Sequence, residues 1–191
     1  MDGARFANAL VSLTASPADM TWRAGVDILT LGATKNGALA CEAVVFFGSE
    51  HAANFAFQRK RGGQTLSKGR FLGAQMEAYL TDGLWLRLAE RANASARRLA
   101  RGLAGTPGVG LAWPTEANEV FVVAPKAMVE RWRAAGAAFH DWSTRSLAPE
   151  RAPRKGETLV RLVTSFETES REIGQLMSIC ADVTASAAVA P

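Results

Sequence analysis

The sequence predicts an α/β fold, in which helices cover β-sheets. Short apolar runs such as VDILTL (26–31) and EVFVVA (119–124) have the composition of buried strands. They alternate with longer stretches in which apolar residues recur at helical spacing. With 191 residues, 48% of them hydrophobic and 21% charged, the chain is long enough for one large domain or two small ones.

The first part of the chain is predicted to hold one helix and two strands. Apolar residues recur over 4–13, which predicts a short helix. The apolar runs VDILTL (26–31) and AVVFF (43–47) predict two strands. We therefore expect residues 1–60 to form the closing part of a larger sheet.

The middle of the chain is predicted to be largely helical. Apolar residues repeat at helical spacing over 65–103, with arginines on the opposite face of the second half. TDG (81–83) interrupts this pattern, and GTPGVG (105–110) ends it with a loop. Residues 61–105 are therefore expected to be linking helices.

The last part of the chain is predicted to be a small α/β domain. Strands and helices alternate here over five segments: strands at 119–124, 137–142 and 158–166, and helices at 125–135 and 167–181. Such an alternation forms one sheet with helices packed on it, so we assign residues 106–191 to a C-terminal α/β domain.

Charge and composition argue against nucleic acid and membranes as partners. The net charge of +4 is a small excess of 22 cations over 18 anions. The densest basic stretch, QRKRGGQTLSKGR (58–70), lacks the interleaved aromatic residues of a base-stacking surface. No apolar run approaches the roughly 20 residues of a membrane span, and the N-terminus lacks the pattern of a signal peptide. We therefore expect a cytoplasmic protein that binds neither nucleic acid nor membrane.

The two cysteines, Cys41 and Cys180, are far apart and have no metal-binding spacing. Each lies among apolar neighbours, which is typical of a buried free thiol in a reducing compartment. We therefore expect neither a disulfide nor a metal site.

Three residues could carry chemistry, and the local pattern leaves a simpler explanation open for each. Lys35 is either a solvated turn residue in GATKNG or a nucleophilic amine placed among small neighbours. Asp2 is either a cap before a helix or a carboxylate that holds a protonated pyridine nitrogen. Arg161, within the strand LVRLVTSF, either faces outward or clamps a substrate carboxylate through its planar fork.

The order of these motifs is more specific than any one of them. DGAR (2–5) is followed by DILTLGATKNG (27–37), EAVVFF (42–47), KRGGQTLSKGRFLGAQ (60–75) and VRLVTSF (160–166). This order resembles the low-specificity L-threonine aldolases, which belong to the β-eliminating lyase group of fold-type-I pyridoxal-phosphate enzymes. The resemblance extends from Asp2 to about Ile179, nearly the whole chain.

The resemblance implies a role for each matching residue. Lys35 matches the catalytic lysine that holds pyridoxal 5'-phosphate covalently, and Asp2 matches the aspartate that bonds the pyridine nitrogen. Arg5 matches the arginine of the same motif, beside the cofactor. Arg161 matches the arginine that grips the substrate carboxylate. The basic pair Lys60 and Arg61 falls in a segment that the family brings near the active site.

The resemblance also implies a fold, an activity and an assembly. Residues 1–60 would be the C-terminal part of the cofactor-binding large domain, joined by the helices of 61–105 to the small domain of 106–191. The implied activity is retro-aldol cleavage of L-threonine and L-allo-threonine to glycine and acetaldehyde, by a homodimer or homotetramer. Phenylserine cleavage or a β-elimination on the same scaffold are the alternatives.

The family's N-terminal half, which precedes DGAR, has no counterpart in this sequence. We therefore expect a C-terminal half that, by itself, binds pyridoxal phosphate poorly or not at all. A catalytically incompetent product that only assembles with other subunits is the remaining alternative.

Overall fold

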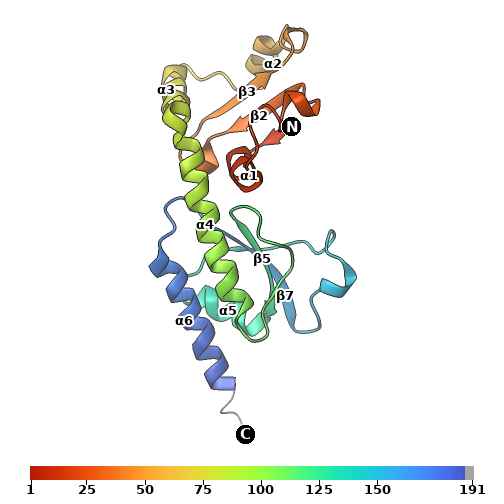
Figure 1. Ribbon diagram of the computed structural model, residues 1–191, viewed down its shortest axis with the longest axis vertical. Helices are drawn as coiled ribbons and strands as arrows, with labels where there is room; N and C mark the ends of the chain where they lie inside the picture. The colour runs from red at the N-terminus through yellow and green to blue at the C-terminus, as the bar shows by residue number, and fades with distance from the viewer. Residues whose placement is uncertain (188–191) are drawn as a thin grey trace. The chain divides into compact units, whose positions relative to one another are not determined.

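The computed structural model describes residues 1–187, with side chains over 1–181. The chain divides into two compact units, Met1–Glu90 and Arg91–Pro191. Helices and strands occur in both units (Figure 1). The division of the chain at residues 60 and 105 stays a prediction.

The first unit contains a three-stranded sheet in the order β1-β2-β3. Its strands are β1 (Asp2–Gly3), β2 (Ile28–Gly32) and β3 (Glu42–Phe46). β1 runs parallel to β2, whereas β3 runs antiparallel to it. The strands expected at 26–31 and 43–47 are thus confirmed, each within two residues of its expected bounds.

Three helices and the start of a fourth complete this unit. They are α1 (Phe6–Leu13), α2 (Phe55–Arg61), α3 (Gly69–Leu80) and α4 (Leu84–Ala104). Short 3₁₀ turns are present at Trp22–Ala24 (η1), Thr34–Asn36 (η2), Ser49–His51 (η3) and Thr81–Gly83 (η4). The predicted break at TDG is therefore confirmed, since η4 separates α3 from α4.

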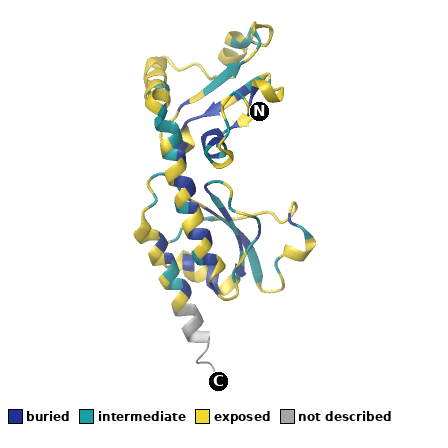
Figure 2. Cartoon of the chain, in the orientation of Figure 1, coloured by how far each residue is buried: buried dark blue, intermediate teal, exposed yellow. Residues whose placement is uncertain are grey.

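One face of this sheet is buried, and the other is exposed at β1 and partly covered at β3, where Phe46 packs against Phe55 of α2. Leu29 and Leu31 of β2 pack against Phe6 and Leu10 of α1, with Trp85 beside them. Strand residues alternate between the two faces, so Asp2 and Thr30, which pair in register, lie on the opposite face. Both are exposed, and Figure 2 shows how burial is distributed along the chain.

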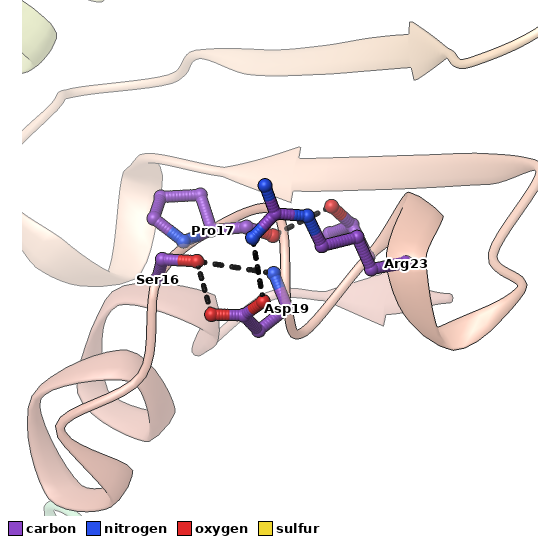
Figure 3. A network of polar contacts seen from close by, with 5 residues as sticks. Ser16, Pro17, Asp19 and Arg23 are labelled. Atoms are coloured by element: carbon purple, nitrogen blue, oxygen red, sulfur yellow. Dashed lines mark hydrogen bonds and ion pairs between the residues drawn. The ribbon is translucent and has the colours of Figure 1, made fainter.

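A polar turn connects α1 to the rest of the unit. The Ser16 hydroxyl donates to Asp19 Oδ2 at 2.5 Å, and Arg23 Nη1 donates to Asp19 Oδ1 at 2.9 Å (Figure 3). The hydrogen bond from Ser16, aided by Arg23, lowers the pKa of the Asp19 carboxyl. These contacts are exposed, so they shape the turn between α1 and β2 rather than form a site.

The second unit contains a four-stranded antiparallel sheet in the order β4-β5-β7-β6. Its strands are β4 (Gly110–Leu111), β5 (Glu119–Pro125), β6 (His140–Asp141) and β7 (Glu157–Val163). Its helices are the end of α4, α5 (Lys126–Ala134) and α6 (Ser170–Ala187), and a short turn, η5, covers Pro149–Arg151. The predicted order of strands and helices from residue 119 onward is confirmed.

The core of the second unit lies between one sheet face and the helices. β5 alternates strictly between buried and half-buried positions, and Val120, Val122 and Ala124 point into the core. Trp132 of α5 is fully buried against the same cluster. None of the helices in the described part of the chain is long and apolar enough to cross a membrane.

Candidate active site

Asp2 begins the short strand β1, and Lys35 follows the neighbouring parallel strand β2. Asp2 lies in β1 and pairs with Thr30, while Lys35 lies in η2, just beyond the end of β2. Because β1 and β2 are parallel, their carboxyl ends meet at one edge of the sheet. Ligands of open α/β sheets bind at this edge.

Two glycines allow the turns after β1 and β2 to pack together. A Cβ added at Gly32 would lie 2.8 Å from Ala4 Cα and 2.8 Å from Glu42 Oε2. A Cβ added at Gly3 would lie 2.6 Å from the Thr30 carbonyl oxygen. Real Cβ atoms do not come so close, so both positions require glycine. This packing brings the DGAR turn directly against the chain that leads into the Lys35 turn.

The DGAR turn holds its charged residues at this edge. The Asp2 carboxylate accepts a hydrogen bond at Oδ1 from the Ala4 backbone N–H, at 2.9 Å. Arg5 is half-buried at the start of α1, and its carbonyl oxygen accepts from the Ala9 N–H. Asp2 itself is exposed. The turn is therefore fixed by its own backbone, while the carboxylate stays accessible.

The turn that carries Lys35 is anchored on both sides. The Ala33 N–H donates to the Cys41 carbonyl oxygen at 3.0 Å, and the Cys41 N–H donates to Thr34 Oγ1 at 3.0 Å. Asn36 is buried, and its Nδ2 donates to Tyr79 Oη and to the Trp85 carbonyl oxygen, both at 2.8 Å. Lys35 lies between these anchors and is exposed. Its backbone is therefore held while its side chain remains accessible.

Arg161 belongs to the second unit, at the centre of β7. It pairs with Phe121 of β5 on one side and with His140 of β6 on the other. Its Nη1 donates to Glu119 Oε1 at 3.1 Å, and its guanidinium carbon lies 4.3 Å from the centre of the Trp142 ring. The guanidinium of Arg161 is therefore held by an ion pair and a cation–π contact, whereas an ordinary outward-facing strand residue points into solvent.

The basic pair Lys60 and Arg61 lies in the last turn of α2 and is exposed. The structure brings Asp2, Arg5 and Lys35 to one edge of the first sheet. Arg161 stands in a separate unit.

Sequence reasoning missed the partners of the predicted residues. Asn36 was visible only as a turn residue of TKNG, and nothing in the sequence connected it with Tyr79. Glu119 and Trp142 adjoin Arg161 only through strand register.

Comparison with known proteins decides the family. The sequence model of the beta-eliminating lyases matches residues 1–127. The chain belongs to the beta-eliminating lyase family. The matched range contains β1, β2 and the Lys35 turn, and it extends through β5.

Within the beta-eliminating lyases, two curated relatives are similar to almost the whole chain. The low specificity L-threonine aldolase of Pseudomonas aeruginosa is 41% identical over 176 residues, which is 92% of this chain and 47% of that protein. The protein of the same name from another Pseudomonas is 39% identical, with the same coverage. The chain therefore spans about half the length of the curated relatives it matches.

Solved structures agree with the predicted fold. The threonine aldolase of Leishmania major matches 95% of this chain and 50% of that chain, with a TM-score of 0.82 and 28% identity. Mouse CSAD has the same fold over 95% of this chain and 45% of that chain, at a TM-score of 0.61 and 14% identity. The predicted α/β class of fold-type-I pyridoxal-phosphate enzymes is confirmed.

This family implies pyridoxal phosphate, and the residues at the sheet edge fit it. The cofactor needs a primary amine for covalent attachment and an anion for its pyridine nitrogen. Lys35 offers the amine just beyond β2, and Asp2 offers the carboxylate in β1, the neighbouring parallel strand; both residues are exposed. These two groups therefore fit pyridoxal phosphate.

Proposed function

We propose that this chain contributes Lys35, Asp2, Arg5 and Arg161 to the retro-aldol cleavage of L-threonine and L-allo-threonine to glycine and acetaldehyde. The observation that carries the proposal is the packing of the DGAR turn against the end of β2, beside Gly32. This packing holds the DGAR turn, which carries Asp2, against the strand that leads into the Lys35 turn. The 41% identity to a low specificity L-threonine aldolase supports the choice of reaction.

Lys35 and Asp2 have different tasks in this proposal. Pyridoxal phosphate, when bound, supplies an electron sink for the pair released when the Cα–Cβ bond breaks. Lys35 holds the cofactor through Nζ, on a turn that Asn36 anchors to Tyr79 and Trp85. Asp2 holds the proton on the pyridine nitrogen, with its carboxylate fixed by the Ala4 N–H.

Arg161 orients the amino-acid substrate through its carboxylate. A guanidinium presents its N–H groups in a planar fork that matches a carboxylate, and it remains charged at any physiological pH. Arg161 is one-fifth exposed, so its charge is partly shielded from water and acts more strongly on a bound anion. Arg5, at the sheet edge, adds a second positive charge beside the cofactor.

The proposed assembly is a homodimer or homotetramer. Large apolar side chains are exposed on α2 and α3 and on the loop between them, among them Phe57, Leu66 and Phe71. Large apolar side chains left exposed close together in the sequence support a contact surface here. Sedimentation of the purified chain at several concentrations measures this directly.

The attachment of the cofactor tests the proposed function. The chain is mixed with pyridoxal phosphate and reduced with borohydride, and peptide mass spectrometry then locates the modified lysine. We expect the label on Lys35 and its loss in Lys35→Ala. Lys155→Ala removes another exposed lysine and should keep the label. Label spread evenly over the exposed lysines would refute the assignment of Lys35.

Substrate choice is tested by glycine release from threonine, allo-threonine and phenylserine. The assay follows a full-length protein that contains this chain, beside its Lys35→Ala and Asp2→Asn variants. We expect release from threonine and allo-threonine that both substitutions abolish. Release from phenylserine alone would replace threonine as the substrate in this proposal.

A further inference from the structure

Arg161 lies on the sheet face opposite the main core of the second unit. Its neighbours Val160 and Leu162 point into that core, so its own side chain points the other way. This second face carries a row of aromatic rings. Trp113 packs edge-on against Phe121, with 5.1 Å between the ring centres, and Phe121 packs against Trp142, with 5.5 Å between the ring centres.

Glu119, a diagonal cross-strand neighbour on β5, holds the Arg161 guanidinium on one side. It pairs with Val163 in the sheet, two residues along β5 from Phe121, which lies opposite Arg161. Diagonal neighbours of this kind are within reach of long side chains. Glu119 Oε1 accepts from Arg161 Nη1 at 3.1 Å, and both side chains are about one-fifth exposed.

Trp142, the residue after β6, covers the guanidinium from the diagonal position on the other side. Its backbone N–H donates to the Leu159 carbonyl oxygen at 2.9 Å, which extends the ladder beyond β6. The ring is therefore held by its own backbone and by Phe121. Its centre lies 4.3 Å from the Arg161 guanidinium carbon, well within cation–π range.

The guanidinium is not fully satisfied by these contacts. Arg161 Nε is buried and has no acceptor within the described part of the chain. Buried donors almost always have a partner, and the exceptions call for an explanation. The unpartnered Nε leaves the guanidinium with hydrogen-bonding capacity that Glu119 and Trp142 do not use.

We propose that Trp142 and Glu119 are positioning residues, which hold the Arg161 guanidinium in place for the carboxylate of an amino-acid substrate. The inference rests on the proposed function, because it explains how Arg161 is prepared for that role. Trp142 fixes the plane of the guanidinium. Glu119 fixes its Nη1 end, and its negative charge moderates the attraction for an incoming anion.

The experiment measures carboxylate binding at Arg161 without the cofactor. N-acetylglycine has a carboxylate but no free amine, so it cannot react with an aldehyde. It is titrated into the isotope-labelled 191-residue chain while the Arg161 Nε–H signal and the backbone amide signals of β7, which every variant retains, are followed by NMR at one pH. Arg161→Lys identifies the signal and shows how much binding depends on the guanidinium.

Three substitutions separate positioning from general structure. Trp142→Leu should weaken binding about fivefold or more, the scale of one partly shielded cation–π contact. Trp142→Phe keeps an aromatic face and should stay within about twofold of wild type. Trp113→Leu is the matched control on the same face: it removes a ring that contacts Phe121 and should leave binding unchanged.

Glu119→Gln tests the second positioning residue. The amide oxygen can still accept from Nη1, while the charge that repels an incoming carboxylate is gone. We expect binding to tighten about threefold, a typical effect of one nearby charge close to the surface.

The outcomes are distinct. Equal binding by wild type and Trp142→Leu overturns the positioning role of Trp142, and weaker binding by Glu119→Gln overturns the charge effect given to Glu119; both leave Arg161 as the carboxylate residue. Binding that survives in Arg161→Lys overturns the role of Arg161 itself. Cofactor attachment at Lys35 is measured separately, so its failure concerns the proposed function alone.

Discussion

Asn36 Nδ2 donates a hydrogen bond to Tyr79 Oη at 2.8 Å, across 43 positions of the sequence. The same amide donates to the Trp85 carbonyl oxygen at 2.8 Å. Asn36 and Tyr79 are both 3% exposed, so water cannot replace either bond. The turn that carries Lys35 is thus tied to α3 and α4 by a single buried amide.

Asn36→Ala should therefore destabilise the chain. It leaves the Tyr79 hydroxyl and the Trp85 carbonyl buried without their donor, which costs about 2–3 kcal/mol in the free energy of unfolding. Urea unfolding followed by fluorescence measures the change. Cofactor labelling at Lys35 should fall as well, because the turn loses its anchor.

Asn54 offers a matched control for this substitution. It is exposed and, within the described part of the chain, makes no side-chain cap bond to α2. Asn54→Ala should change the free energy of unfolding by no more than about 0.5 kcal/mol. Equal effects of the two substitutions would show that the buried amide does not anchor the turn.

Tyr79 should titrate at an unusually alkaline pH. Burial raises the pKa of its hydroxyl, and the charge of Glu42 acts in the same direction against the opposing Asn36 hydrogen bond. A raised pKa in the folded state adds stability that is fully present below the unfolded value. That stability is lost as the pH rises through the folded value.

The sequence offers a direct measurement of this effect. Tyr79 is the single tyrosine of the chain, so tyrosinate absorbance reports this group alone. We expect the midpoint to lie above that of free tyrosine in the native chain and to return to it in urea. Tyr79→Phe should flatten the alkaline part of the stability curve, and an ordinary midpoint in the native chain would contradict the buried position.

The strands with a clear burial pattern were predictable from the sequence, and the short ones were not. β5 is covered on one face and half-covered on the other, so it reads as an apolar run. β1 has only two residues and exists because β2 pairs with it. No local pattern can reveal such a strand, since its cause lies 28 positions away at Thr30.

Two errors have a common cause in burial. α2 was not predicted because six of its seven residues are exposed, which leaves no apolar stripe to detect. The strand expected at 137–142 is reduced to β6, two residues long. Ala137 instead caps α5 by donating to the Trp132 carbonyl oxygen, and Phe139 packs on the Trp132 ring. Ala137 and Phe139 are therefore apolar because they pack on α5, not because they lie in a strand.

The residues of the candidate site were predictable from the sequence, whereas their contact partners were not. Lys35, Asp2, Arg5 and Arg161 were named from the order of motifs, because each lies in a distinctive local sequence. Their partners come from distant segments and depend on register and helix packing. Physical contact between Arg161 and Trp142 requires β6 to pair with β7, which no local pattern specifies.

Both cysteines should be unreactive in the native chain. Cys41 and Cys180 are free thiols, at 4% and 2% exposure, as the sequence predicted. Burial raises the pKa of each thiol, which lowers the thiolate fraction that reacts. Ellman's reagent should therefore label neither thiol quickly in buffer and both in denaturant. Ser178→Cys places a thiol at an exposed position and provides the reactive control, while rapid native labelling of Cys41 would refute its burial.

Gly32→Ala tests the contact on which the proposed site depends. Its new Cβ would meet Ala4 Cα, a backbone atom that cannot move without shifting the DGAR turn. We expect a loss of about 1–3 kcal/mol in the free energy of unfolding, together with weaker cofactor labelling at Lys35.

Gly73→Ala is the matched control for this substitution, because its Cβ would meet no described heavy atom within 4 Å on the exposed side of α3. It should stabilise the chain by about 0.5–1 kcal/mol, since alanine favours a helix over glycine. Urea unfolding of both variants measures whether each substitution lowers or raises the free energy of unfolding. If Gly32→Ala left both this free energy and the labelling of Lys35 unchanged, the close packing of the DGAR turn on β2 would not support the proposed site.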